Sequence, residues 1–159
     1  IMKRYFLNII TFTTLFFSGA HAMADQNTHP NLTLLSNFAG EVFVNKDLSN
    51  LDAYMKKDYI QHNPAVAQGS EGFKAFFADW FAAIPDFHYE LKNIIANDEF
   101  VWVYGTYSGT HENEWLGIPA TQAEYKFDAI DIFRIEDGKL AEHWDVMDLH
   151  TLFTQLQAN

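Results

Sequence analysis

The stretch KFDAIDIFRIEDGKLAEHWDVMD, residues 126–148, reads as two long β-strands joined by a tight turn. Apolar and polar residues alternate through both halves, as in strands with one buried face, and Asp137-Gly138 is a frequent hairpin turn. Asp131 interrupts the apolar face of the first strand. A strand that only closed a core would not place His143 and Asp145 two residues apart, between apolar neighbours. The hairpin therefore predicts a sheet and a candidate site on it.

The side of the sheet that these residues share depends on the turn. With the two-residue loop Asp137-Gly138, Asp131 faces Trp144, and His143 lies on the other side. With a three-residue loop over 136–138, a left-handed Gly138 and a bulge, the parity changes. Asp131 then faces His143, and Asp145 follows on the same side. The residues of the hairpin alone leave both registers open.

In the second register the three ionisable residues share one face, with apolar side chains around them: Phe127, Phe133 and Met147. A carboxylate among such neighbours loses hydration, which favours its neutral form unless a cation or hydrogen-bond donors compensate. A lone buried aspartate is more often structural. A group of titratable side chains within hydrogen-bonding reach is what general acid–base catalysis requires. The predicted catalytic residues are Asp145, His143 and Asp131.

Further polar and aromatic residues are predicted to line the same pocket: His62, Asn63, His111, Trp115 and Trp144. A metal site built from His62, His111 and His143 with one of the aspartates is an alternative. The spacing HExxH is absent, and we predict no metal. Neither a GxSxG motif nor a glycine-rich phosphate loop occurs, so we expect no serine nucleophile and no cofactor.

The pattern outside the hairpin changes from helical to strand-like along the chain. Apolar residues recur at helical spacing over 31–43 and, most regularly, over 73–84, where Ser70 can cap the helix and Pro85 ends it. Short helices are expected over 48–55 and 149–157, and a brief extended piece over 57–62. Four long strands are predicted over 87–96, 99–111, 123–136 and 139–147. This order indicates an α+β fold, with a curved antiparallel sheet against helices on one face.

Composition excludes several classes of function. The 21 acidic and 10 basic residues give a formal net charge of −11, which repels nucleic acid and anionic membranes. The absence of cysteine excludes disulfides, thiolate chemistry and zinc–sulfur sites. Both faces of the strand FVWVYGTYSGTH, 100–111, are largely apolar or aromatic. One face packs on the helices, and the other needs a cavity or a partner, so we expect a homodimer through the sheet.

The first 22 residues have the pattern of a secretory signal peptide. Lys3 and Arg4 precede an apolar run over 5–17, and Ala20-His21-Ala22 is a small-x-small cleavage site. The run is too short to span a bilayer, and a buried N-terminal helix is the alternative. We therefore expect export, periplasmic or secreted, of a single domain, 23–159, with no membrane attachment after cleavage.

The chain resembles SnoaL-like proteins, the polyketide-cyclase-like branch of the nuclear-transport-factor-two-like superfamily. The resemblance covers about residues 32–156 and rests on YIQHNPAVAQGSEGFKAFF (59–77), GTH (109–111), LGIPAT (116–121) and DAIDIFRIEDGKLAEHWDVMD (128–148). Bacterial proteins described as predicted SnoaL-like aldol-condensation enzymes share QHNP, GTH and EHWD. The resemblance implies an α+β cone that encloses an apolar pocket and dimerises through the sheet. It also favours the second hairpin register, which we adopt.

The same resemblance implies roles for individual residues. In characterised cyclases of this family, an aspartate of the last strand is the acid/base of an intramolecular aldol closure, and Asp145 occupies the matching position. Asp131 matches a polar pocket residue that looks like a histidine in those cyclases, so the two differ there. Asn63-Pro64 matches a pocket-lining Asn-Pro.

These observations predict a cofactor-independent acid/base enzyme that acts on a small apolar carbonyl compound by enolate chemistry of the aldol, cyclase or isomerase type. Asp145 would remove a proton next to the carbonyl. Asp131, His143, His62 or Asn63 would hydrogen-bond the enolate oxygen. The alternative is a non-catalytic module of the same fold, in which the polar groups only orient a small ligand.

Overall fold

The computed structural model describes residues 29–157, so the predicted signal peptide and the start of the mature domain lie outside the described residues. The helical elements come first: α1 (Pro30–Ala39), the π-helical turn η2 (Gly40–Val44), α2 (Leu51–Tyr54) and α3 (Gly69–Ala83). The strands are β1 (Met55–Gln61), β2 (His88–Ala96), β3 (Phe100–Thr110), β4 (Glu124–Glu136) and β5 (Lys139–Met147), followed by α4 (Leu149–Gln157). No helix of this described part is both long and apolar enough to cross a membrane.

The strands form one curved sheet of five strands in the order β1-β5-β4-β3-β2. The predicted α+β fold is confirmed, and β2 to β5 form the expected antiparallel meander. The sheet is nevertheless mixed, because the segment predicted as a brief extended piece is a full strand, β1, parallel to β5. Parallel neighbours need a long crossover, and here α3 and strands β2 to β4 lie between them in the chain.

The hairpin between β4 and β5 has a two-residue turn, so the predicted three-residue loop is wrong. Glu136 pairs with Lys139, and both Asp137 and Gly138 have positive φ, 53° and 70°. The register then shifts by one residue inside β5, where Ala141 is the extra residue of a bulge.

The bulge changes which residues of β5 face the concave side of the sheet, an effect that was predicted for a three-residue loop. Beyond Ala141, Asp131 pairs with Asp145, and Phe133 pairs with His143. The prediction that Asp131 faces His143 across the strands is therefore wrong, because its partner is Asp145. All three ionisable side chains still lie on one face, because residues 131, 133, 143 and 145 share it.

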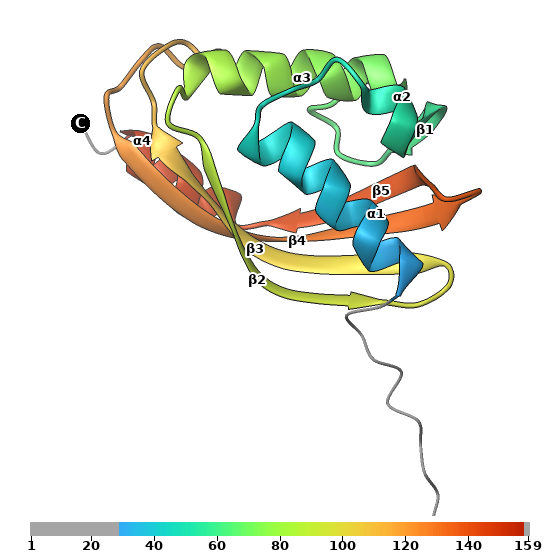
Figure 1. The fold of residues 1–159 in the computed structure, drawn as a ribbon. Coiled ribbons are helices and arrows are strands. Elements are labelled where there is room, and N and C mark those ends of the chain that lie inside the picture. The colour runs from blue at the N-terminus through green and yellow to red at the C-terminus, as the bar shows by residue number, and fades with distance from the viewer. Residues whose placement is uncertain (1–28, 158–159) are drawn as a thin grey trace, which may run out of the picture.

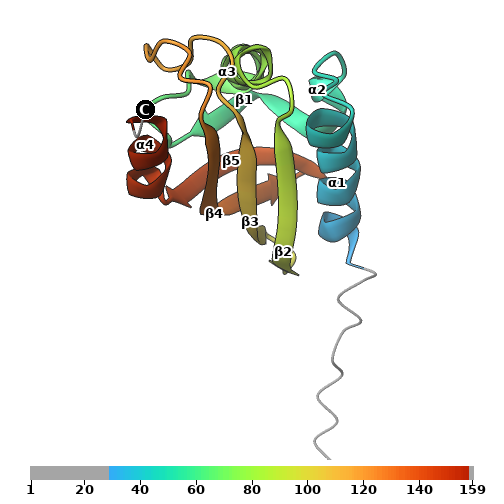
Figure 2. The ribbon, with the colours of Figure 1, turned by 90° about the vertical axis from the view of Figure 1, so that its left-hand side faces the viewer.

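Helix α3 covers the concave side of the sheet (Figure 1). Its residues Phe73, Phe77 and Trp80 recur at helical spacing and are buried. The helix begins after Gln68, with no side-chain cap, and the predicted cap Ser70 is buried inside its first turn. Helices α1 and α4 lie on opposite sides of β2, β3 and β4 (Figure 2).

The outer face of the sheet carries apolar side chains in cross-strand rows. Ile95, Trp102, Ile132 and Trp144 make up one row, and Tyr104, Ile130 and Val146 the next. Trp102 is 46% exposed and Val146 68% exposed. An exposed apolar patch of this kind commonly marks an interaction surface.

Candidate active site

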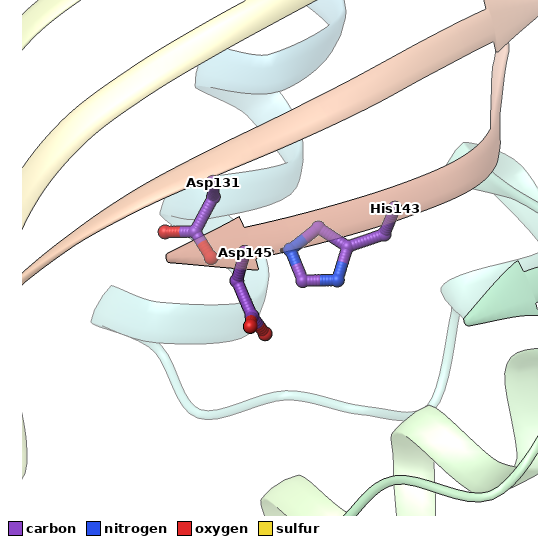
Figure 3. Close-up of side chains that lie close together, drawn as sticks. All are labelled: Asp131, His143 and Asp145. Carbon is purple, nitrogen blue, oxygen red and sulfur yellow. Dashed lines mark hydrogen bonds and ion pairs between the residues drawn. The ribbon is translucent and has the colours of Figure 1, made fainter. Parts of the chain in front are cut away.

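Asp131 of β4 and His143 and Asp145 of β5 point toward one another on the concave face (Figure 3). One nitrogen or oxygen atom from each lies within 4.8 Å of the others. Asp131 and His143 are buried, and Asp145 is half-buried. The regular alternation of the two strands, corrected by the bulge at Ala141, brings the three groups together.

Two aromatic rings pack against the imidazole of His143, and both of its nitrogens have a polar partner. The Phe133 ring stacks on it with centroids 4.7 Å apart, and the Tyr59 ring lies nearly parallel at 6.4 Å. Nε2 is 3.1 Å from Oδ1 of Asp131, and Nδ1 is 3.0 Å from Oε1 of Gln61. The ring therefore has one defined orientation.

Tyrosine residues surround the carboxyl group of Asp131. The hydroxyl of Tyr107 donates to Oδ2 of Asp131 over 3.1 Å. Burial, and then the negative charge of Asp131, raises the pKa of Tyr107 well above its usual range, and the pKa of Tyr59 is raised in the same way. Tyr107 therefore remains a phenol and a hydrogen-bond donor at neutral pH.

Asp145 is held by Asn63, which directly follows Gln61-His62 after the end of β1. The Asn63 amide donates from Nδ2 to Oδ2 of Asp145 over 2.6 Å. Its own Oδ1 accepts from the backbone N–H of Ala65 at 2.9 Å, which fixes the orientation of the amide. Asn63 therefore presents its NH₂ group to Asp145 rather than its oxygen.

The three ionisable groups open on a cavity of about 120 Å³ between the sheet, α3 and α4. Its lining is mostly aromatic and aliphatic, and its polar members are Gln61, Asn63, Tyr107, Asp131, His143 and Asp145. No lysine or arginine is among the described residues that line it. The predicted pocket residues Asn63, Trp115, Phe133 and Met147 are in this lining.

The structure places His62 and Trp144 on the outside of the sheet, so their assignment to the pocket is wrong. His62 and Trp144 stack on each other at 4.7 Å, and His62 Nε2 contacts Glu142 at 2.8 Å. Each follows an inward-facing residue, Gln61 or His143, and strand neighbours point to opposite faces. His62 therefore cannot reach the enolate oxygen for which it was predicted.

His111 and Phe127 face the interior but not the cavity. His111 is fully buried at the end of β3, where Nδ1 lies 3.0 Å from the hydroxyl of Thr121. Burial lowers the pKa of its imidazole. Phe127 packs under Tyr107 and Trp80, at 5.5 and 6.4 Å between ring centroids. Neither residue lines the cavity, so both belong to the core rather than to the pocket.

Gln61 and Tyr107 are polar residues of the site that the sequence analysis did not identify. The spacing along β1 could have identified Gln61. In a strand, every second residue lies on the same side, so Gln61 shares a side with Tyr59 and Asn63. The aromatic stripe of α3, interpreted as core, also supplies lining residues, among them Phe73, Phe76 and Phe77. Apolar spacing alone does not separate a core face from a cavity wall.

Asp131, His143 and Asp145 are the described residues that could share a cation. The alternative set of His62, His111 and His143 is not brought together, since His62 is outside the sheet and His111 is in the core. A cation on Nε2 of His143 would have to replace its contact with Asp131. The geometry places the carboxyl group of Asp145 beside a hydrogen-bonded imidazole and carboxyl group in an apolar cavity. Such a group can remove a proton at one point and donate one at another.

Comparisons with known proteins identify the family of the chain. Residues 33–156 match the family model of the SnoaL-like polyketide cyclases. The nogalonic acid methyl ester cyclase of Streptomyces nogalater is 28% identical over 113 residues, which are 67% of this chain and 83% of that protein. An aklanonic acid methyl ester cyclase of Streptomyces peucetius is 29% identical over 105 residues, 65% of this chain and 71% of that protein.

Solved structures share the fold. TsrD from Streptomyces laurentii has a TM-score of 0.74 and 34% sequence identity, over 82% of this chain and 96% of that one. A SnoaL-like polyketide cyclase from Agrobacterium tumefaciens has a TM-score of 0.68 over 79% of this chain and 97% of that one, and at 15% identity it is a likeness of fold alone. The family model covers nearly all of the described residues, and the chain belongs to the SnoaL-like polyketide cyclase family.

Proposed function

We propose that the protein is a cofactor-independent acid/base enzyme that forms an enolate from a small, mostly apolar carbonyl compound. The observation that carries the proposal is the position of Asp145, whose carboxyl group opens on an apolar cavity directly beside the hydrogen-bonded Asp131 and His143. The curated relatives are cyclases of methyl ester compounds, which supports a carbonyl substrate. Aldol closure, cyclisation and isomerisation each begin from an enolate.

The chemistry divides between the two strands. Asp145 removes the proton next to the carbonyl, because its carboxyl group is fixed in place by Asn63 and opens on the cavity that would hold the substrate. Asp131 and His143 lie beside Asp145 at the cavity and would hydrogen-bond the carbonyl oxygen as it gains negative charge. Donors that are already oriented stabilise that charge without reorganisation.

The cavity supports a small substrate. Its volume of about 120 Å³ is less than the roughly 300–1,000 Å³ that is usual for drug-sized ligands. A water-sized group needs about 10–15 Å³ of such space, so the cavity holds on the order of ten non-hydrogen atoms. Larger substrates would have to displace lining residues such as Trp115 and Leu116 of the β3–β4 connection.

Deuterium exchange tests the proposal. The protein is incubated in D₂O with a panel of small apolar ketones and esters, and loss of the signal of the α-hydrogen is followed by NMR. Asp145→Asn is expected to reduce exchange by about 10²–10⁴-fold, with the circular dichroism spectrum and ketone affinity nearly unchanged. Asp58→Asn is the matched control, because Asp58 is exposed on β1 and away from the cavity.

The outcomes separate the two functions. Full exchange activity in Asp145→Asn removes Asp145 from the mechanism. A parent protein that binds a ketone tightly and exchanges no hydrogen is a ligand-binding module, the alternative considered for this fold.

We also propose that two copies pair through the outer face of the sheet. The support is the row of apolar residues around Trp102, which helices leave exposed. Aromatic side chains are enriched at the centres of protein interfaces.

A further inference from the structure

Gln61 is buried at the end of β1, where its side-chain oxygen has two partners. Oε1 accepts from the backbone N–H of Asn63 at 2.9 Å and lies 3.0 Å from Nδ1 of His143. If the amide were turned over, its NH₂ group would face the backbone N–H of Asn63, donor against donor. The oxygen is therefore the atom that faces His143.

The backbone of Gln61 is fixed as well. Its N–H donates to Oε1 of Gln68 at 2.9 Å, and its carbonyl oxygen accepts from Nε2 of Gln68 at 2.7 Å. The side-chain amide of Gln68, just before α3, thus pairs with the backbone of Gln61 as a neighbouring strand would. Gln61 has little freedom to move away from the imidazole.

An oxygen that can only accept requires a proton on Nδ1 of His143. The other nitrogen, Nε2, then faces Oδ1 of Asp131 at 3.1 Å. Without a proton in that contact, two lone pairs would face each other. The pair holds one proton there in either of two forms: a neutral imidazole with a carboxylic acid, or an imidazolium with a carboxylate. Both forms have zero net charge.

The second oxygen of Asp131 agrees with this assignment. Oδ2 accepts from the hydroxyl of Tyr107 at 3.1 Å, so the shared proton is on the Oδ1 side. Asp145 has no such proton-sharing partner among the described residues, and it receives a hydrogen bond from Asn63. With Asp145 as a carboxylate, the cavity then contains one net negative charge instead of two.

We propose that Gln61 is a positioning residue: it fixes the proton on Nδ1 of His143 and so makes the Asp131–His143 pair the proton donor, with Asp145 as the base. This deepens the proposed function and rests on it for its catalytic meaning. Asp145 takes the α-proton, the electrons of the broken C–H bond form the C=C bond, and the carbonyl π electrons move to the oxygen. That oxygen accepts the shared proton of the pair. The product is a neutral enol, and the negative charge has moved from Asp145 to the pair.

Nitrogen-15 NMR of histidine-labelled protein without substrate tests the assignment, and His143→Gln identifies the signal. The parent is expected to show a protonated Nδ1 at His143. Gln61→Leu removes the acceptor, so Nδ1 is expected to lose its proton to solvent, and the one proton left in the pair stays on Nε2, hydrogen-bonded to the carboxylate of Asp131. Gln61→Glu keeps an acceptor at this position and is the matched control, with Nδ1 still protonated.

Turnover provides the second measurement. In the exchange assay, Gln61→Leu is expected to lower kcat by about 10²-fold, because the pair then has one proton fewer and a net negative charge, which makes it a weaker proton donor. An unprotonated Nδ1 in the parent overturns the assignment, and so does an unchanged His143 spectrum in folded Gln61→Leu. Both spectra are recorded without substrate, so they fail or succeed independently of the enolate chemistry, whereas a parent with no exchange on any carbonyl compound contradicts only the proposed function.

Discussion

Asp131 is a buried acid whose two oxygens both have hydrogen-bond partners, the hydroxyl of Tyr107 and the imidazole of His143. An isolated buried carboxylate is strongly unfavourable, and these contacts offset the loss of water. Tyr107 and His143 are in turn fixed by aromatic neighbours, including Phe127 and Phe133. At the scale of single residues, the site is held by packing as much as by hydrogen bonds.

His111 provides a prediction about pH. Burial lowers its pKa below the ordinary value of 6.5, so the unfolded chain binds this proton more readily than the folded one. The stability that depends on a neutral His111 is therefore fully present above that ordinary value and is lost as the pH falls below it. In His111→Gln, thermal unfolding followed by circular dichroism should show a smaller fall in Tm between about pH 7.5 and 5.5. Equal slopes in the variant and the parent would contradict this prediction.

The β4–β5 hairpin is the element that determines the site. Its turn is only two residues long, and without the bulge at Ala141 it would pair Asp131 with Trp144. His143 and Asp145 would then lie on the outer face. One extra residue in β5 thus decides which side of the sheet carries the acids.

Gly138→Ala tests the turn. Gly138 has φ of 70°, a conformation that costs an alanine about 1–2 kcal/mol. An added Cβ would meet nothing within 4 Å, so the cost is conformational and not a clash. Tm is expected to fall by roughly 4 °C for each kcal/mol in a domain of this size.

Gly40→Ala is the matched control for that experiment. Gly40 also has space for a Cβ, but its φ of −61° is helical. Alanine there should be neutral or stabilise the fold by up to about 1 kcal/mol. Equal destabilisation by both substitutions would show that the left-handed turn is not the cause.

The sequence predicts those parts of the fold that follow regular patterns. The period of two in β2 to β5 and the helical stripe of α3 were enough for the α+β fold and its antiparallel meander. The bulge could not be located, because Ala141 fits a regular strand equally well. Strand β1 was predicted only as a brief extended piece over 57–62, since the polar run Lys56-Lys57-Asp58 in its middle hides the apolar alternation. Because the pairing of this piece with β5 was not predicted, the inward direction of Gln61 and the outward direction of His62 could not be identified.

On the scale of the whole molecule, the two faces of the sheet differ in what covers them. The concave face is closed by helices and contains the cavity, whereas the outer face leaves Trp102, Tyr104 and Val146 exposed. Ion pairs lie among these side chains, including Lys92 with Asp128 and Arg134 with Glu142. Apolar rows with paired charges are suited to contact with an identical surface.

Trp102→Glu tests the proposed pairing of two copies. A carboxylate at the centre of the apolar row would be buried without a partner in a dimer, so the variant is expected to be monomeric. Sedimentation velocity measures the change. Val44→Glu is the control, because Val44 is 77% exposed on η2 and not on the sheet, and it should sediment like the parent. A monomeric parent would contradict the pairing.

The residues that line the cavity also favour uncharged ligands over anionic ones. The lining contains two carboxyl groups and, among its described residues, no lysine or arginine that could pair with an incoming anion. Coulomb repulsion grows as water is excluded, so a free acid would meet an electrostatic barrier that its ester or ketone counterpart would not. An acid converted to its ester would therefore enter the cavity more readily than the free acid, in a protein whose net negative charge already repels anions.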